Sequence, residues 1–241
     1  MSDGVLDAGL FGPGEAAQAV EADQPRAHVK TLYPANSWNP ENFAREQIRG
    51  LVRQVFFSSA ASPVRQVVFS AVDADTDVRS ICRKVGEALA LETAENIAVA
   101  GNFPQLLHKP GNAASSPDPA TDRDAHPAQN AILHRPNLWL VPLADYEAAA
   151  PSTAALHSRL CKLRAEFAYS VVEAPSVGMS NEATTIAQLA DGIILILSAE
   201  RTRRARAFTI KERLEAARVR ILGTVLSDRE FPMPEGIYRR L

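Results

Sequence analysis

Three aspartates lie in one short loop between an apolar run and a helical stretch. Residues 67–71 are Val, Val, Phe, Ser and Ala, and residues 78–91 repeat apolar side chains at helical spacing. The loop between them contains Asp73, Asp75 and Asp77. Nucleotide-binding α/β domains begin with this order of strand, loop and helix. These residues therefore suggest two possible kinds of binding: the loop could bind phosphate, or its carboxylates could bind a divalent cation.

The loop lacks the groups that bind phosphate. A working phosphate loop, G-x-x-x-x-G-K-[ST], uses glycines to turn backbone N–H groups inward and a lysine to meet the phosphates. Residues 72–79 contain neither glycine nor lysine. At about 4 Å and an effective dielectric of about 20, each aspartate would repel a phosphate charge by roughly 4 kcal/mol before screening. Three interpretations stay open: an acidic helix start capped by Asp77 or Thr76 without a ligand, a cation site, or a nucleotide bound in an altered way.

Apolar strands alternate with amphipathic helices along the chain. Helices are expected at 42–57, 78–91, 153–167, 182–189 and 203–218, and strands at 65–71, 96–100, 137–142, 169–174, 192–198 and 219–226. Because near-continuous apolar strands alternate with helices, we expect an α/β fold with a mostly parallel central sheet and helices on both faces.

Length and composition fit one such domain preceded by an arm. The chain has 241 residues, of which 46% are hydrophobic and 22% are charged. We expect residues 39–241 to form a single α/β domain, with a loose loop rich in Pro, Ala and Asp at about 104–131. Residues 1–38 contain few large apolar side chains and are expected to form a flexible arm.

Charge and apolar patterning exclude several classes of protein. A net charge of −2 gives no pull toward nucleic acid. The first residues lack a signal-peptide pattern, and the longest apolar run, 192–199, is too short to span a bilayer. Cys82 and Cys161 lie far apart without metal-ligand spacing, so we expect two buried or half-buried thiols and no metal. The sequence favours a cytoplasmic protein with no nucleic-acid partner.

Six segments, taken in order, resemble the cytoplasmic domain of bacterial tyrosine autokinases of capsule and exopolysaccharide export. That family belongs to the deviant-Walker P-loop ATPases. The matching segments are 46–51 (EQIRGL), 67–72 (VVFSAV), 136–142 (PNLWLVP), 167–177 (FAYSVVEAPSV), 189–192 (LADG) and 221–226 (ILGTVL). The resemblance runs from about Phe43 to Leu226 and implies a P-loop NTPase-like fold.

The departures from this family fall on its chemistry. The resemblance places the family's P-G-E-G-K-[ST]-T on Asp73, Ala74, Asp75, Thr76, Asp77, Val78 and Arg79. Both glycines and the lysine are absent, and Val78 has no hydroxyl to ligate magnesium. The family's V-D-A-D strand is V-A-G-N at residues 99–102, without its two carboxylates. Walker B keeps an acid, Glu173, which is one methylene longer than the family's aspartate and is the candidate catalytic group.

The resemblance implies roles for residues outside the loop. The family carries a Glu-x-x-Arg-x-x-Arg oligomerisation motif, which Glu46 and Arg49 match. Its third position is Val52, and Arg53 is shifted by one. Tyr238 is what remains of the family's tyrosine cluster and is a candidate phosphosite. The basic run at 201–206 is either an anion site or a solvated helix face.

We therefore expect a non-catalytic, kinase-like pseudo-ATPase that needs no cofactor. It would regulate or assemble a system of exopolysaccharide or capsule biosynthesis and export. Its partner would be a membrane polysaccharide co-polymerase, which could hold it at the membrane, or a competent kinase relative, and it could form homo-oligomers. One alternative is a protein-tyrosine kinase or ATPase that binds ATP and Mg²⁺ through an unorthodox loop and Glu173. Another is an adaptor in a different pathway that uses the same fold.

Overall fold

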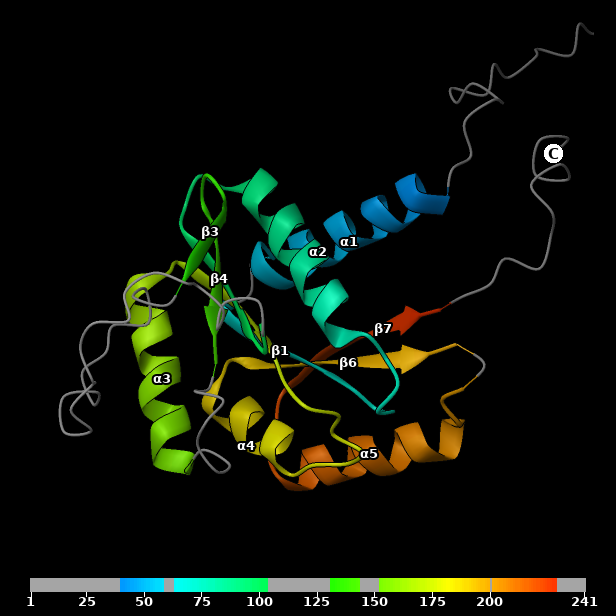
Figure 1. Cartoon of the computed structure of the whole chain (residues 1–241). Helices are drawn as coiled ribbons and strands as arrows, with labels where there is room; N and C mark the ends of the chain where they lie inside the picture. The colour runs from blue at the N-terminus through cyan, green and yellow to red at the C-terminus, as the bar shows by residue number, and fades with distance from the viewer. Residues whose placement is uncertain (1–39, 59–62, 104–130, 144–151, 200, 229–241) are drawn as a thin grey trace, which may run out of the picture. The chain divides into compact units, whose positions relative to one another are not determined.

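The apolar strands assemble into one mixed sheet (Figure 1). The structure is a computed structural model, and it describes residues 40–58, 63–103, 131–143, 152–199 and 201–228. The strands are β1 (Gln66–Ala71), β2 (Ile97–Gly101), β3 (Ile132–Arg135), β4 (Leu138–Pro142), β5 (Tyr169–Glu173), β6 (Gly192–Ser198) and β7 (Ile221–Ser227). Their order in the sheet is β3-β4-β2-β5-β1-β6-β7, and all neighbours run parallel except β3 and β4.

Five described helices cover the two faces of the sheet (Figure 1). They are α1 (Pro40–Phe56) and α2 (Val78–Glu92) on one face, and α3 (Thr153–Glu166), α4 (Glu182–Leu189) and α5 (Arg204–Ala216) on the other. Each face has its own apolar core, because the central strands are buried on both sides. The expected α/β class, with a mostly parallel sheet between helical layers, is confirmed. None of the described helices is long and apolar enough to cross a membrane.

The expected elements agree with the observed ones to within two residues at each end. Strand β3 was not expected. Its four residues are all exposed, and among the described residues it pairs only with β4, so it shows no alternation of buried and exposed side chains. The turn between β3 and β4 is anchored by Asn137, whose Nδ2 donates to the carbonyl oxygens of Ala90 and Thr93 at 3.2 and 2.8 Å.

Several expectations fall outside this fold or differ from it. The expected arm, residues 1–38, and nearly all of the expected loop, 104–131, lie outside the described residues. Cys82 is buried as expected, but Cys161 is exposed. The reason is that Leu160 occupies the inward position of α3, and the next residue along a helix points about 100° away from it.

A single carboxylate joins three elements at the amino edge of the sheet. Asp191, in the L-A-D-G segment, accepts from the backbone N–H groups of Arg65 and Gln66 at 2.8 Å each through Oδ2. Its Oδ1 accepts from Arg164 Nη2 at 2.7 Å. Burial alone would raise the pKa of Asp191, but these donors together outweigh it and hold the pKa below its usual value. The ionised side chain therefore links the starts of β1 and β6 to the end of α3.

Replacing Asp191 by asparagine should lower the free energy of unfolding at pH 7 by about 1–3 kcal/mol, because hydrogen bonds to a charged acceptor are lost. The pKa is lowered on folding, so the wild-type advantage should be full above the usual value of 3.8 and vanish as the pH falls through the folded-state pKa. Urea unfolding across pH would measure this. Asp75→Asn, at an exposed position, is the matched control and should leave stability nearly unchanged.

Candidate functional site

The loop after β1 lies at the carboxyl edge of the sheet and is fastened to the chain that follows β5. Ser70 Oγ donates to the carbonyl oxygen of Pro175 at 2.6 Å, and it accepts from the N–H of Val177 at 3.0 Å. A Cβ at Gly178 would collide with the carbonyl oxygen of Val72, so glycine permits this close approach. These contacts hold the base of the loop.

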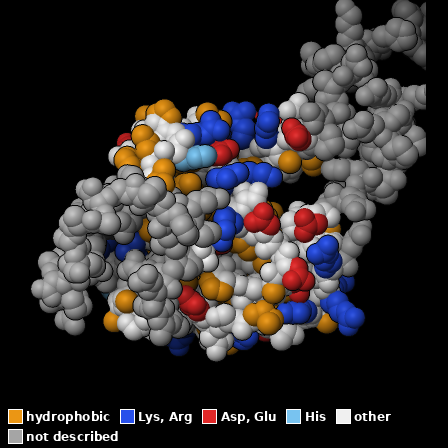
Figure 2. All heavy atoms as spheres, in the orientation of Figure 1, with side chains coloured by type: hydrophobic (Ala, Val, Ile, Leu, Met, Phe, Trp, Pro, Cys, Tyr) orange, Lys and Arg blue, Asp and Glu red, His pale blue; other side chains and the backbone are white. Residues whose placement is uncertain are grey.

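Asp73 ties the first half of the loop to the start of α5. Its Oδ1 lies 3.2 Å from Arg206 Nη1, and its Oδ2 accepts a hydrogen bond from the hydroxyl of Thr202. Thr202 Oγ1 in turn accepts from the N–H of Ser198 at 2.9 Å. At the right of the view in Figure 2, acidic and basic side chains accordingly lie side by side over this edge. The carboxylate faces a cation from the same chain.

Asp77 caps α2, as the sequence predicts. Its side chain accepts from the N–H of Ser80 at 3.0 Å, which satisfies one of the free amides in the first helical turn. Ala74 and Asp75 are exposed at the tip of the loop, and Val78 is buried in the core under α2. Within the described part of the chain, no three acidic, His or Cys side chains converge to hold a metal ion. The loop aspartates therefore do not gather into one cluster.

Glu173 at the end of β5 is the other acid of this edge. Its Oε2 accepts from the N–H of Asn102 at 3.2 Å and lies 3.5 Å from Arg79 Nε in the first turn of α2. The Glu173 side chain is 15% exposed and that of Arg79 is 42% exposed. A Cβ at Gly101 would collide with the Glu173 carboxylate. The glycine thus makes room for a side chain one methylene longer than aspartate.

The electrostatics of Glu173 have two opposing causes. Burial disfavours the charged carboxylate and raises the pKa of Glu173. The positive charge of Arg79 and the hydrogen bond from Asn102 act in the opposite direction and offset part of the effect. Burial outweighs them, and the pKa of Glu173 stays above its usual value. Among the groups that lower this pKa, Arg79 has the largest effect.

The structure brings the sequence-predicted residues together in pairs and adds partners that the sequence did not single out. Arg79 meets Glu173, and Asp73 meets Arg206. Arg206 belongs to the basic run at 201–206, so the sequence shows its positive charge. The sequence does not show that its side chain points toward Asp73. Asn102 acts through its backbone N–H, which its residue type cannot signal.

The residues of the expected oligomerisation motif make contacts within the chain. Arg49 Nη1 lies 3.3 Å from Glu46 Oε1, and Arg49 Nε lies 3.3 Å from Glu92 Oε1. Arg53 donates to both carboxylate oxygens of Glu92 at 3.1 Å, which is the first cause of the lowered pKa of Glu92. These ion pairs join α1 to the end of α2 at the surface. Tyr238 lies outside the described residues.

Comparison with solved structures identifies the fold. No protein-family model and no curated protein matches the sequence. The chimerical protein CapA2B2 is similar with a TM-score of 0.58 and 16% identity, over 75% of this chain and 83% of that one. The VpsO kinase domain gives 0.56 and 16%, over 80% and 100% of the two chains. The kinase domain of the Escherichia coli tyrosine kinase Etk gives 0.53 and 12%, over 79% of each.

ATPases of other systems share the same architecture. They include a ParA family ATPase from Chlorobium tepidum and the MinD cell division protein of Aquifex aeolicus. At these identities the similarity establishes the fold alone. The chain therefore has the P-loop NTPase-like α/β fold of bacterial tyrosine kinase domains and of ParA and MinD ATPases, as the sequence resemblance implied.

Replacing Arg79 by alanine should raise the pKa of the Glu173 carboxyl further, because burial then acts without the facing cation. Carbon-detected NMR titration of the Glu173 side chain measures this directly. Arg83→Ala removes the same charge from an exposed position on α2 and is the matched control.

The same pair of variants gives a second readout in stability. A raised folded-state pKa means that Glu173 favours the folded state at low pH, and that this contribution is lost as the pH rises through the folded-state pKa. Arg79→Ala should steepen the loss, whereas Arg83→Ala should not. An Arg79→Ala chain with the wild-type titration of Glu173 would contradict the ion pair.

Proposed function

We propose that this chain is a non-catalytic, kinase-like protein whose nucleotide site is filled by its own side chains. The observation that carries the proposal is the ion pair between Arg79 and Glu173. By the family resemblance, Arg79 stands two residues after the position of the phosphate-binding lysine, and Glu173 stands at the Walker B acid. In active P-loop enzymes a magnesium ion lies between these two regions and neutralises charge. Here a guanidinium supplies positive charge beside the acid.

The charges of the loop support the same conclusion. Asp77 replaces the lysine and binds a backbone amide of its own helix, while Asp73 is engaged by Arg206 and Thr202. Asp75 is exposed at the tip, where the phosphates of a nucleotide would approach. Phosphoryl transfer depends almost entirely on positioning and charge stabilisation, so a loop of this sign opposes it.

The biological role that we propose is regulation or assembly in exopolysaccharide or capsule biosynthesis and export. Its support is the resemblance of six sequence segments to the autokinases of these systems, together with the fold shared with tyrosine kinase domains. A membrane polysaccharide co-polymerase or a catalytically competent kinase relative would be the partner. The protein would then act in the cytoplasm and reach the membrane through that partner.

Two other functions use the same fold. Glu173 lies at the carboxyl edge of a parallel sheet, where such folds bind ligands, so an ATP-binding tyrosine kinase or ATPase would use it once Arg79 moved aside. The similarity to ParA and MinD ATPases favours, as the second alternative, an adaptor in a different pathway. Nucleotide binding separates the first alternative from our proposal, and co-purification with a polysaccharide co-polymerase separates the second.

Calorimetric titration of ATP and of ADP, each with Mg²⁺, into the full chain tests the proposal. We expect no heat of binding at high micromolar nucleotide. A restored loop, made by Ala74→Gly, Thr76→Gly, Asp77→Lys and Val78→Thr, should be needed before binding appears. Adding Arg79→Ala to that variant should increase the affinity for the Mg²⁺ nucleotide again, because the competing guanidinium is removed from the acid.

The contrary result is equally well defined. Wild-type turnover of ATP that disappears in Glu173→Ala would show that this acid works in catalysis, and the proposal would be abandoned. Circular dichroism of each variant confirms that the comparison is made between folded chains.

The proposed assembly through α1 is tested by light scattering. Glu46→Ala combined with Arg49→Ala should lower the mass of any oligomer, because it removes the two residues that match the family's motif. Glu41→Ala combined with Arg45→Ala removes another exposed ion pair from the same helix and should leave the mass unchanged. Equal masses for the wild-type chain and the Glu46 and Arg49 double variant would count against a role of this motif in assembly.

A further inference from the structure

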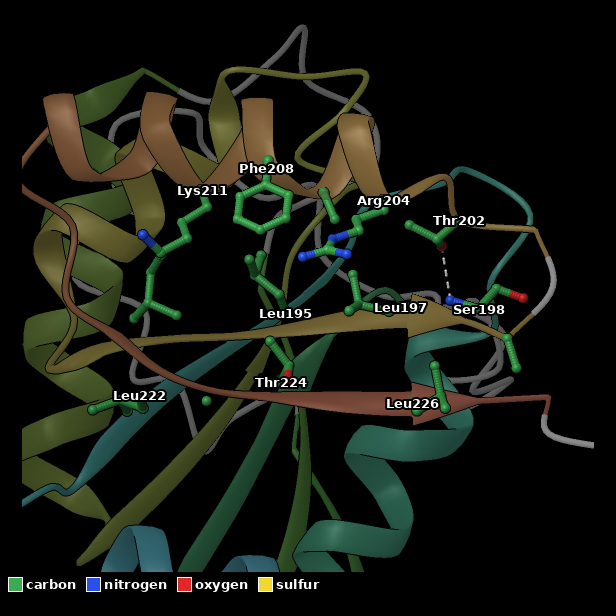
Figure 3. A pocket seen from close by; sticks show the side chains of 14 residues that line it. Leu195, Leu197, Ser198, Thr202, Arg204, Phe208, Lys211, Leu222, Thr224 and Leu226 are labelled. Atoms are coloured by element: carbon green, nitrogen blue, oxygen red, sulfur yellow. Dashed lines mark hydrogen bonds between the residues drawn. The ribbon is translucent and has the colours of Figure 1, made fainter.

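An apolar groove of about 670 Å³ opens between α5 and the β7 side of the sheet (Figure 3). Leu195 and Leu197 of β6, with Thr224 and Leu226 of β7, line it from the sheet, and Phe208 points into it from α5. The groove lies on the face opposite to α1 and α2, away from the Arg79–Glu173 ion pair. Two of its lining residues, Ser198 and Thr202, also belong to the contacts that hold Asp73 of the loop.

The groove leaves large apolar side chains in contact with water. Leu226 is 58% exposed and Phe208 is 49% exposed, in a protein whose other strand residues on this face are mostly buried. Strand β7 pairs with β6 on one side and, among the described residues, has no neighbour on the other. Such an apolar edge is normally covered by another segment.

The charges at the groove favour an occupant with carboxylates. The charged lining residues are Arg204 and Lys211, and the described lining contains no acid. Lys211 is paired with Glu215 at 2.8 Å, just outside the lining. Arg204 lies over the Phe208 ring, 5.4 Å from its centroid. The positive charge of Arg204 therefore lies directly beside the apolar surface of the groove.

The backbone turns away from the strand direction at one end of this groove. Asp228, which follows β7, has a φ of 54°, in the left-handed region that aspartate tolerates. Its Oδ2 accepts from Ser198 Oγ at 2.9 Å and from Ser227 Oγ at 3.3 Å. Ser198 is itself a lining residue. The chain thus leaves β7 from a fixed point at the groove, and residues 229–241 follow.

The sequence after this point has the composition that the groove requires. Phe231 and Met233 lie between two acids, Glu230 and Glu235. The residues after Phe231 and Met233 are prolines, which cannot donate to a strand ladder but cost little entropy when a segment becomes ordered. Side-chain docking therefore suits this segment better than strand addition.

The reach of the segment is sufficient. Met233 lies five positions after Asp228, an extended distance of about 17 Å. The wall of the groove from Arg204 to Lys211 is about 10 Å long on a helix. A segment attached at the groove also has an effective concentration in the millimolar range, which a separate copy lacks. A second copy docked by the same face would moreover bring its own Arg204 toward this one.

We propose that residues 229–235 fold back over β7 and seat Phe231 and Met233 in the groove, with their flanking glutamates facing Arg204. The docked segment covers the exposed parts of Leu226 and Phe208 and closes the apolar edge of the sheet within one chain. The interaction is independent of nucleotide, so it stands or falls separately from the function proposed above.

Methyl NMR of the full chain labelled at methionine tests the docking. Met233 should give an upfield-shifted methyl signal with cross-relaxation to the Phe208 ring, at a shift independent of protein concentration. Phe208→Ala and Leu226→Ser, both at exposed positions, should each return the signal to its free-chain shift. Glu230→Gln with Glu235→Gln should weaken the docking and make it less sensitive to salt. Met179, which is 72% exposed, is the internal control and should not move.

Two results would overturn the proposal. One is a sharp Met233 methyl signal at the free-chain shift that is the same in the wild-type chain and in both groove variants. This would mean that the segment does not enter the groove. The other is cross-relaxation seen only between labelled and unlabelled chains and rising with concentration, which would assign the groove to a second copy. Thermal unfolding of both groove variants near the wild-type temperature confirms that only docking has changed.

Discussion

Burial penalises the charged form of a carboxylate, so a mostly buried acid requires compensating positive charge, and Arg79 of the same chain supplies part of it to Glu173. The rest of the edge follows from this requirement. Gly101 leaves space for the longer acid, the N–H of Asn102 supplies a hydrogen bond, and the first turn of α2 brings Arg79 within 3.5 Å. In the P-loop enzymes that share this fold, a bound metal ion provides such charge. The same sheet edge can therefore be completed by a cation that belongs to the protein.

The fold and the site answer different questions. The mostly parallel sheet between two helical layers is retained, and it alone gives the similarity to kinase domains and to a ParA family ATPase. Function has to be argued from the side chains at the carboxyl edge. There the acids are engaged by an arginine, a threonine hydroxyl or the amides of their own helix. These acids face cations and donors of their own chain, which is why we favour a role in assembly over catalysis.

Sequence reasoning recovered the central elements because their signals are strong and local. Buried strands such as β6 are unbroken apolar runs, and α2 shows both its apolar period and its Asp77 cap. Strand β3 escaped because an exposed edge strand of four residues carries no alternation. The pairing of Arg79 with Glu173 escaped because the two residues lie far apart in sequence and meet only through the order of the strands. Long, flexible arginine side chains give no sign in sequence of where they point.

The two ion pairs that restrain the loop are asymmetric in their exposure. Asp73 and Glu173 are mostly buried, whereas their partners Arg206 and Arg79 are about half exposed to water. Dissolved ions can therefore approach the cationic side of each pair and screen it over a Debye length of about 8 Å at physiological salt. The stiffness of this loop then depends on ionic strength. In a relative that binds nucleotide, the stiffness of the corresponding loop would depend on whether the nucleotide is bound.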